Sequence, residues 1–246
     1  MSIRNIAAYH FVNLDRLSTW RESILEQASS CELKGTVLLS PEGINLFLAG
    51  ANDQIDQFVQ WLCAHPEFSE LEHKDSESAS VPFKRLKVKI KNEIIRMNHP
   101  TIQPQSGRAP AVDAKTTERW IAQGHDDEGR PIVLLDTRND FEVRAGTFAG
   151  AVSWQLSRFT EFPEAAQAHA DELKDKTVVS FCTGGIRCEK AAIYMRSIGL
   201  DHVYQLDGGI LKYFELTGGT GFEGTCFVFD ERETLDPALR PVSLQE

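Results

Sequence analysis

The sequence has little of what marks membrane or secreted proteins. It contains no apolar run approaching the roughly 20 residues that cross a bilayer. The first residues have only a short apolar stretch and no small-residue cleavage site, which argues against a secretory signal. Five cysteines, an odd number without regular spacing, provide no disulfide framework. We therefore expect a protein that works in the reducing cytoplasm and does not associate with a membrane.

Sequence patterns for common cofactors are also missing. No glycine-rich dinucleotide fingerprint follows a predicted strand. The seven histidines show no i, i+4 pairing or clustering with carboxylates of the kind that holds non-haem iron. No metal site and no bound cofactor are evident. Internal repeats and low-complexity tracts are absent too.

The balance of charge is acidic, since 26 Lys and Arg stand against 36 Asp and Glu for a formal net charge of −10. An acidic chain does not adhere generally to nucleic acid, so any such binding needs a local basic patch. With 41% hydrophobic and 25% charged residues, the chain has the composition of a folded protein and not of a disordered one. Its 246 residues suffice for two modest domains.

The first hundred residues predict a split βαβ, or ferredoxin-like, arrangement with the order β-α-β-β-α-β. Apolar periodicity and turn residues place its elements. Pro41 and Gly43 mark a hairpin turn, and Asn52 or Asp53 caps the second helix. Residues 70–80 are polar and predict a solvated loop. The expected elements are strands at 6–12, 36–40, 44–49 and 83–96, with helices around 17–24 and 52–62.

The predicted last strand is strongly basic. Apolar Leu86, Val88 and Ile90 alternate with the cations Arg85, Lys87, Lys89 and Lys91. Because side chains alternate between the faces of a strand, these cations line one face. One interpretation is an edge strand whose lysines block aggregation. The other is a stripe that binds the phosphates of a nucleic acid. No aromatic-rich motif of the RNA-recognition type accompanies it.

A proline-rich stretch separates this region from a different pattern. Residues 99–110 hold three of the ten prolines among polar residues, which predicts a linker. Beyond it, buried strands at 132–135, 177–181 and 203–206 alternate with helices at 189–198 and 210–216, with Gly199 as a helix cap. This alternation predicts an α/β domain with a parallel sheet, whose ligands bind at the carboxyl ends of the strands.

One loop in this second domain has the residues of a reactive site. Cys182 follows the second buried strand and begins the sequence CTGGIRC, before a helix. Glycines at such a junction let successive N–H groups point inward and form an anion-binding nest. The helix dipole and Arg187 favour the thiolate, which is the nucleophile. The predicted anion-binding positions are Thr183, Gly184, Gly185 and Ile186. An inert buried cysteine is the alternative.

The length of this loop distinguishes two classes of protein. Cysteine phosphatases place five residues between cysteine and arginine, whereas four separate Cys182 from Arg187. The shorter loop resembles that of the sulfur-handling rhodanese domain. Five motifs together resemble the tRNA uridine hydroxylase family of rhodanese-domain proteins, from Ile6 to about Asp230. These motifs are LLSPEGIN, FKRLKVKIK, LDTRNDFEV, CTGGIRCEKA and QLDGGILKYFE.

The resemblance implies an α+β ferredoxin-like domain over residues 1–98, the linker 99–110, an α/β rhodanese-like catalytic domain over 111–220, and a C-terminal tail, 221–246. It implies oxygen-dependent hydroxylation of the wobble uridine of tRNA to 5-hydroxyuridine, with molecular oxygen as co-substrate. The family's active cysteine corresponds to Cys182, where a persulfide intermediate is expected. Arg85, Lys87, Lys89 and Lys91 then hold tRNA phosphates while the cysteine loop meets the anticodon loop.

The same resemblance suggests roles for three further residues. Cys188 is either a resolving thiol after oxidation of Cys182 or a packing residue at the helix start. Asp136 and Arg138 lie at the end of a neighbouring strand, where they either support the loop through a buried pair or contact substrate; loop support is the expected role. Two other functions remain open: a sulfurtransferase that carries a persulfide from a sulfur donor, and a binding module without enzymatic activity.

Overall fold

The computed structural model describes residues 2–242, which form two compact units. Unit 1 contains the chain up to Arg96 together with Phe229–Arg232. Unit 2 contains Met97–Val228 and the chain from Glu233 on. The chain therefore crosses from unit 1 to unit 2 after Arg96, just before the predicted linker. It returns to unit 1 for the short segment Phe229–Arg232. Within residues 2–242, no helix combines the length and apolar character required to span a bilayer.

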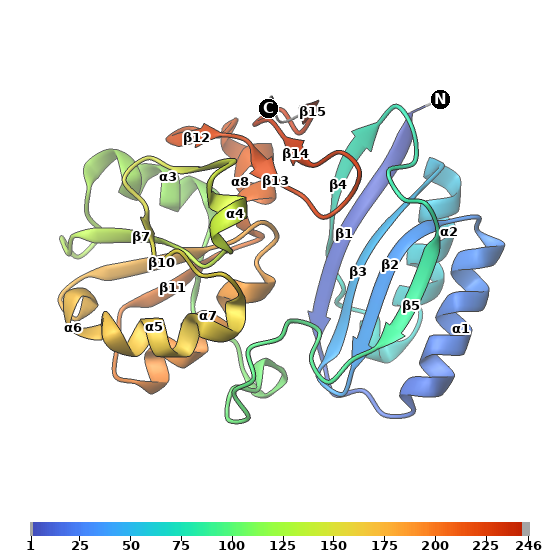
Figure 1. The fold of residues 1–246 in the computed structure, drawn as a ribbon, viewed down its shortest axis with the longest axis horizontal. Helices are drawn as coiled ribbons and strands as arrows, with labels where there is room; N and C mark the ends of the chain where they lie inside the picture. The colour runs from blue at the N-terminus through green and yellow to red at the C-terminus, as the bar shows by residue number, and fades with distance from the viewer. Residues whose placement is uncertain (1, 243–246) are drawn as a thin grey trace. The chain divides into compact units, whose positions relative to one another are not determined.

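Unit 1 is a five-stranded sheet covered on one face by two helices (Figure 1). The strands lie in the order β4-β1-β3-β2-β5. Its elements in chain order are β1 (Ile3–Phe11), α1 (Leu17–Ser30), β2 (Lys34–Ser40), β3 (Gly43–Gly50), α2 (Asn52–Cys63), the 3-10 turn η1 (Pro66–Phe68), β4 (His73–Ser78) and β5 (Leu86–Ile90). The predicted ferredoxin-like arrangement is confirmed, and the hairpin turn falls at Pro41-Glu42 as expected.

The last strand of this arrangement was assigned wrongly. The sixth element is β4, which lies inside the predicted solvated loop 70–80 and pairs antiparallel with β1. Polar side chains hold it there. Arg4 of β1 forms ion pairs with Asp75 and Asp56, and Asn5 Nδ2 donates to Ser78 Oγ at 2.9 Å. The basic strand is an additional fifth strand, shorter than predicted and parallel to β2 at the edge of the sheet.

The two faces of this sheet differ in character. Ile6, Ile44 and Val37 point toward the helices and join the buried core with Ile24 of α1 and Phe58 of α2. Since side chains alternate along a strand, the residues between them lie on the opposite face. The second helix begins at Asn52 after an Ala51 cap, so the predicted Asn52 or Asp53 cap is wrong by one residue or more.

Unit 2 is a parallel sheet between helices. The main sheet has the strand order β6-β11-β10-β7-β9, and its neighbouring strands pair in parallel. Helices α3 and α8 pack together on one face, and α5 and α7 on the other (Figure 1). The elements that concern the site are β6 (Ala111–Val112), α3 (Ala114–Gln123), β7 (Ile132–Asp136), α4 (Asp140–Val143), β8 (Gly146–Phe148), β9 (Val152–Ser153), α5 (Phe162–Ala168), α6 (Ala170–Leu173), β10 (Thr177–Phe181), α7 (Ile186–Ser197), β11 (Val203–Leu206) and α8 (Gly209–Thr217).

The α/β prediction for unit 2 is thus confirmed, with shifted helix ends. Helix α7 begins three residues before the predicted start, at Ile186, because the cysteine loop turns directly into it. Gly199 follows its end with φ +92°, a conformation that favours glycine. The C-terminal residues add small antiparallel pieces: β12 (Phe222–Gly224) pairs with β8, and β13 (Cys226–Phe227), β14 (Thr234–Leu235) and β15 (Pro241–Val242) form a separate three-stranded sheet.

Candidate active site

The cysteine loop lies at the carboxyl end of the central strand of unit 2. Cys182 directly follows β10, which is flanked by β7 and β11. Because all three strands are parallel, the segments that follow them meet at one edge of the sheet. These segments are Thr137–Arg138 after β7, the cysteine loop after β10, and Asp207–Gly208 before α8.

The backbone of the loop turns toward the sulfur. The Cys182 side chain is fully buried, and its Sγ accepts a hydrogen bond from the Gly185 amide at 3.2 Å. The amides of Arg187 and Cys188, in the first turn of α7, also bond to this sulfur. Of the four positions predicted to form the nest, Gly185 therefore supplies an amide to Sγ, and Arg187 and Cys188 supply two more. Gly184 and Ile186 are the half-buried parts of the loop.

This environment favours the thiolate. Burial alone would raise the pKa of Cys182, since a buried charge loses its hydration. A hydrogen bond from the Cys188 thiol, the positive charge of Arg187 and the two amides of α7 outweigh burial and lower the pKa to about 5. At neutral pH, Cys182 is therefore an anion held by hydrogen-bond donors.

Arg187 acts on this sulfur from a fixed position. Its guanidinium makes two bonds to Glu142 at the end of α4, Nη1 to Oε2 at 2.5 Å and Nη2 to Oε1 at 2.7 Å. Both side chains are buried, Glu142 at 0% exposure and Arg187 at 5%. Among the described residues, Arg187 Nε has no hydrogen-bond partner. Sequence reasoning noted Glu142 only as part of a motif, because nothing local links it to a residue 45 positions later.

Cys188 is a buried thiol in contact with Cys182. Burial and the neighbouring thiolate raise the pKa of Cys188 well above its ordinary value. It therefore stays protonated and donates to Cys182. Its Sγ also lies 3.6 Å from Thr137 Oγ1, which in turn donates to the Phe181 carbonyl at 3.0 Å. Thr137 thus links the ends of β7 and β10, a role that the sequence did not indicate.

Asp136 and Arg138 form the buried pair that was expected, with both side chains at 0% exposure. Arg138 Nε donates to Asp136 Oδ1 at 2.9 Å, and Arg138 Nη2 to Oδ2 at 2.6 Å. The hydrogen bonds of this pair reach β8. Arg138 Nη2 donates to the Gly146 carbonyl at 2.6 Å, and Thr147 Oγ1 donates to Asp136 at 2.8 Å. The pair is therefore anchored to β8.

A second helix, α8, binds the carbonyl groups of the loop. The amides of Ile210 and Leu211, in the first turn of α8, donate to the carbonyls of Cys182 at 2.9 Å and Thr183 at 3.1 Å. Gly209 permits this approach: it has φ +68°, and a Cβ there would lie 2.5 Å from the Cys182 oxygen. The loop backbone is therefore fixed at its carbonyls by α8, while its amides face the sulfur.

Gly209→Ala is expected to disrupt the loop because the added Cβ collides with loop backbone. Gly218→Ala is a matched control, since Gly218 has φ +66° but open space around a built Cβ. The control carries only the left-handed strain of about 1–2 kcal/mol. We expect Gly209→Ala to lower the free energy of unfolding in urea beyond that amount. Equal losses in the two variants would show that the close approach has no energetic weight.

The low pKa of Cys182 predicts a specific pH dependence. Between about pH 5 and the pKa of an unfolded cysteine, about 8.5, the folded chain holds a thiolate and the unfolded chain a thiol. Unfolding then takes up a proton, so the free energy of unfolding rises with pH across this range. We expect a steeper rise in the wild type than in Cys182→Ser, together with a thiolate absorbance that appears near pH 5. A thiolate signal that appears only above pH 8 would contradict the electrostatics described above.

The basic residues lie in the other unit, on or beside β5. Lys89 and Lys91 are exposed, as is Arg85 just before the strand, and Lys87 is half-buried. No group of three or more His, Cys, Asp or Glu side chains that could hold a metal occurs in the described part of the chain.

Comparisons with known proteins agree with this architecture. Residues 3–94 match the model of the UPF0176 acylphosphatase like domain, and residues 107–216 match that of the Rhodanese-like domain. A protein of Bordetella petrii is 68% identical over 240 residues, covering 98% of this chain and 95% of the relative. One of Bordetella pertussis is 62% identical over 98% of each chain. One of Cupriavidus taiwanensis is 57% identical over 98% of this chain and 86% of its own.

All three relatives carry the name tRNA uridine(34) hydroxylase. The identity spans both units and is far above what unrelated proteins of one fold share. The resemblance inferred from the five motifs is thereby confirmed. The chain belongs to the family of the tRNA uridine(34) hydroxylases.

Proposed function

We propose that this protein hydroxylates uridine 34 of tRNA, the wobble position of the anticodon, with molecular oxygen as co-substrate. The ring C5–H becomes C5–OH, which gives 5-hydroxyuridine. One atom of O2 enters this hydroxyl and the other leaves as water, with the two electrons supplied by an added thiol reductant, which is oxidised to its disulfide. The names of the relatives supply the substrate class. The observation within the chain that carries the proposal is the Cys182 thiolate, enclosed by amides at the carboxyl end of β10.

The residues around the sulfur have separable roles in this proposal. Cys182 is the reacting group, either as a nucleophile or as the atom that carries sulfur or oxygen. The amides of Gly185, Arg187 and Cys188 stabilise its negative charge as an oxyanion hole would. Cys188 lies in contact with Cys182, where it can resolve an oxidised Cys182 as a disulfide.

The rim of the loop suggests where the base approaches. A Cβ built on Gly184 meets no heavy atom within 4 Å, so space opens directly above this residue. The sulfur itself is fully buried beneath the loop. We infer that the anticodon base approaches over Gly184, because an unpaired base can leave its stack and enter such a space.

The decisive test is direct. Purified protein is incubated with an unmodified tRNA that carries uridine 34, in air and without oxygen, and digested nucleosides are analysed by mass spectrometry. We expect 5-hydroxyuridine only in air. In parallel, tRNA from a strain lacking the gene should lose nucleosides derived from 5-hydroxyuridine. Unchanged nucleosides in that strain, with no second enzyme compensating, would refute the proposal.

The second candidate is sulfur transfer, which the same amide ring favours because a persulfide is also a buried anionic sulfur. It predicts that Cys182 gains one sulfur atom from thiosulfate or a protein donor, and that cyanide then releases thiocyanate. Mass spectrometry of the intact protein under donor excess distinguishes the two functions. A Cys182 that never acquires sulfur excludes the transferase.

A further inference from the structure

The face of the unit 1 sheet that points away from α1 and α2, called here the non-helical face, has a regular arrangement that the basic strand alone does not convey. Helices α1 and α2 cover the other face. The strand registers place Phe47 of β3 opposite Ala7 of β1 on one side and Thr36 of β2 on the other. Thr36 in turn lies opposite Lys87 of β5. One row across the non-helical face therefore reads Lys74, Ala7, Phe47, Thr36, Lys87.

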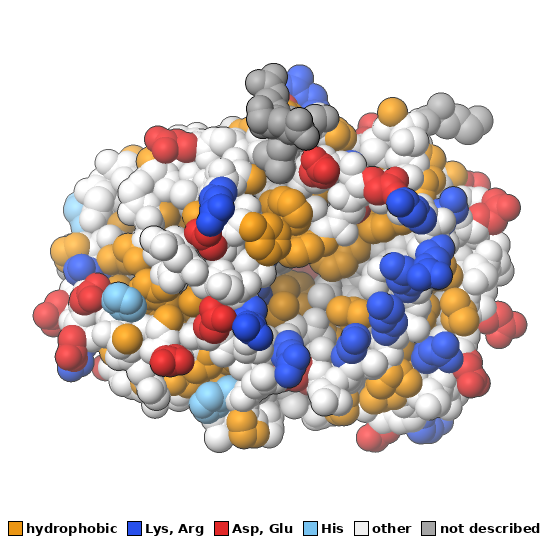
Figure 2. All heavy atoms as spheres, in the orientation of Figure 1, with side chains coloured by type: hydrophobic (Ala, Val, Ile, Leu, Met, Phe, Trp, Pro, Cys, Tyr) orange, Lys and Arg blue, Asp and Glu red, His pale blue; other side chains and the backbone are white. Residues whose placement is uncertain are grey.

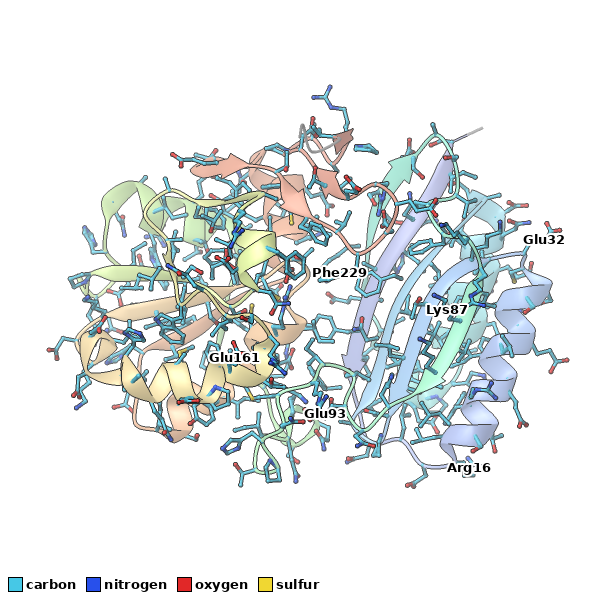
Figure 3. All side chains as sticks on the ribbon, viewed as in Figure 1. Arg16, Glu32, Lys87, Glu93, Glu161 and Phe229 are labelled. Atoms are coloured by element: carbon cyan, nitrogen blue, oxygen red, sulfur yellow. The ribbon has the colours of Figure 1, made fainter. Side chains whose placement is uncertain are left out.

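In the neighbouring row, Tyr9 of β1 lies opposite Asn45 of β3, whose buried side chain donates to the Ile94 carbonyl at 3.3 Å. Asn45 of β3 lies opposite Leu38 of β2, which lies opposite Lys89 of β5. Lys87 and Lys89 are two residues apart and so share this face. Figure 2 shows lysine and arginine side chains gathered over β5, and Figure 3 labels Lys87 on that strand.

Phe47 has the surroundings of a stacking residue. It is half-buried on the non-helical face of a central strand, whereas its neighbours Leu46 and Leu48 are fully buried on the helical face. Its partners across the sheet, Ala7 and Thr36, are small. RNA-recognition domains stack unpaired bases on aromatic side chains of the central strands of a similar βαββαβ sheet.

The charge of this surface favours one kind of partner. Residues 83–91 contain five cations and no acidic residue, in a chain whose net charge is −10. Edge protection accounts for lysines on β5, which is an edge strand. It does not account for an aromatic ring two strands away, between small residues. A polyanion with exposed bases complements both features.

We propose that this non-helical face binds single-stranded RNA, with one unpaired base stacked on Phe47 and the adjoining phosphates held by Lys87 and Lys89. This inference rests on the proposed function, and it assigns to unit 1 an unpaired base of the substrate tRNA other than uridine 34. The predicted tRNA contacts of Arg85 and Lys91 then belong to the margin of the same surface.

Stacking and charge are separable by mutation. We measure binding to an anticodon stem-loop RNA in the catalytically silent Cys182→Ser background, so that hydroxylation plays no part. Phe47→Leu keeps an apolar side chain but removes the ring, and we expect affinity to fall about 5-fold or more. Phe47→Trp keeps a ring and should retain affinity. Lys87→Gln with Lys89→Gln should flatten the slope of log affinity against log salt by about 1.4, the value for two phosphate contacts on a single strand.

A control variant and a control RNA accompany these binding measurements. The double variant Lys115→Gln with Lys174→Gln removes two exposed cations of unit 2 and should bind as the parent does. A fully paired RNA of equal length should be insensitive to Phe47→Leu. Loss of stem-loop binding in that variant, with unchanged thermal unfolding, supports the proposal. Equal affinity of Phe47→Leu and the parent overturns it, as does an equal effect on paired RNA. Hydroxylation of tRNA is assayed separately with Cys182 intact. If the binding assay shows the expected effect of Phe47→Leu but no hydroxylation is detected, only the proposed function is refuted.

Discussion

Cys182→Ser is expected to abolish 5-hydroxyuridine formation, with a loss in rate of about 10³-fold or more. Serine nearly matches cysteine in volume, so the fold should persist. Its hydroxyl, however, stays protonated where Cys182 is a thiolate with a pKa of about 5. The amides of the loop then face a neutral oxygen that can neither attack nor carry sulfur or oxygen. Nucleoside mass spectrometry after a single incubation with tRNA measures the effect.

A matched control separates this effect from the general loss of a thiol. Cys63 of α2 is a half-buried cysteine in unit 1, and burial raises its pKa, so it lacks the features that activate Cys182. Cys63→Ser should retain full activity. If Cys182→Ser were to hydroxylate tRNA at the wild-type rate, the cysteine would have no part in the reaction, and the protein would use a different site.

The cysteine loop was predictable because its chemistry is local. Cys182, Gly185 and Arg187 lie within six residues, and their order at a strand-to-helix junction dictates which amides face the sulfur. The partners that fix this loop lie far away in sequence. Glu142 precedes Arg187 by 45 residues, and Thr137 precedes Cys188 by 51. Only the pairing of β7 with β10 brings them together, and no periodicity in one sequence reports such a contact.

Strand β4 shows the corresponding limit for the fold. Its sequence, HKDSES, lacks the apolar alternation by which strands are recognised. It forms because β1 offers an unpaired edge and two polar anchors, Arg4 for Asp75 and Asn5 for Ser78. The basic strand, in contrast, alternates clearly. This regularity predicts a strand correctly but places it as the final strand of the arrangement, whereas it is the additional edge strand β5. How clearly the residues of a strand alternate therefore does not indicate where that strand lies in the sheet.

Glu142→Ala should destabilise the protein by about 3–5 kcal/mol, because it leaves the charge of Arg187 buried without its partner. Glu128→Ala is the matched control. The Arg130–Glu128 pair has the same nitrogen-to-oxygen distance, 2.5 Å, but its side chains are 31% and 68% exposed, so we expect a change of at most about 1 kcal/mol. Urea unfolding at neutral pH measures both.

A double variant then separates stability from chemistry. Glu142→Met with Arg187→Met replaces the buried pair by apolar side chains and should recover most of the lost stability. It should not recover activity, because the positive charge that helps to lower the pKa of Cys182 is gone. The thiolate absorbance of the double variant should therefore appear at higher pH than in the wild type. A stable double variant with wild-type activity would mean that Glu142 and Arg187 serve the fold alone, and that the amides suffice to hold the anion.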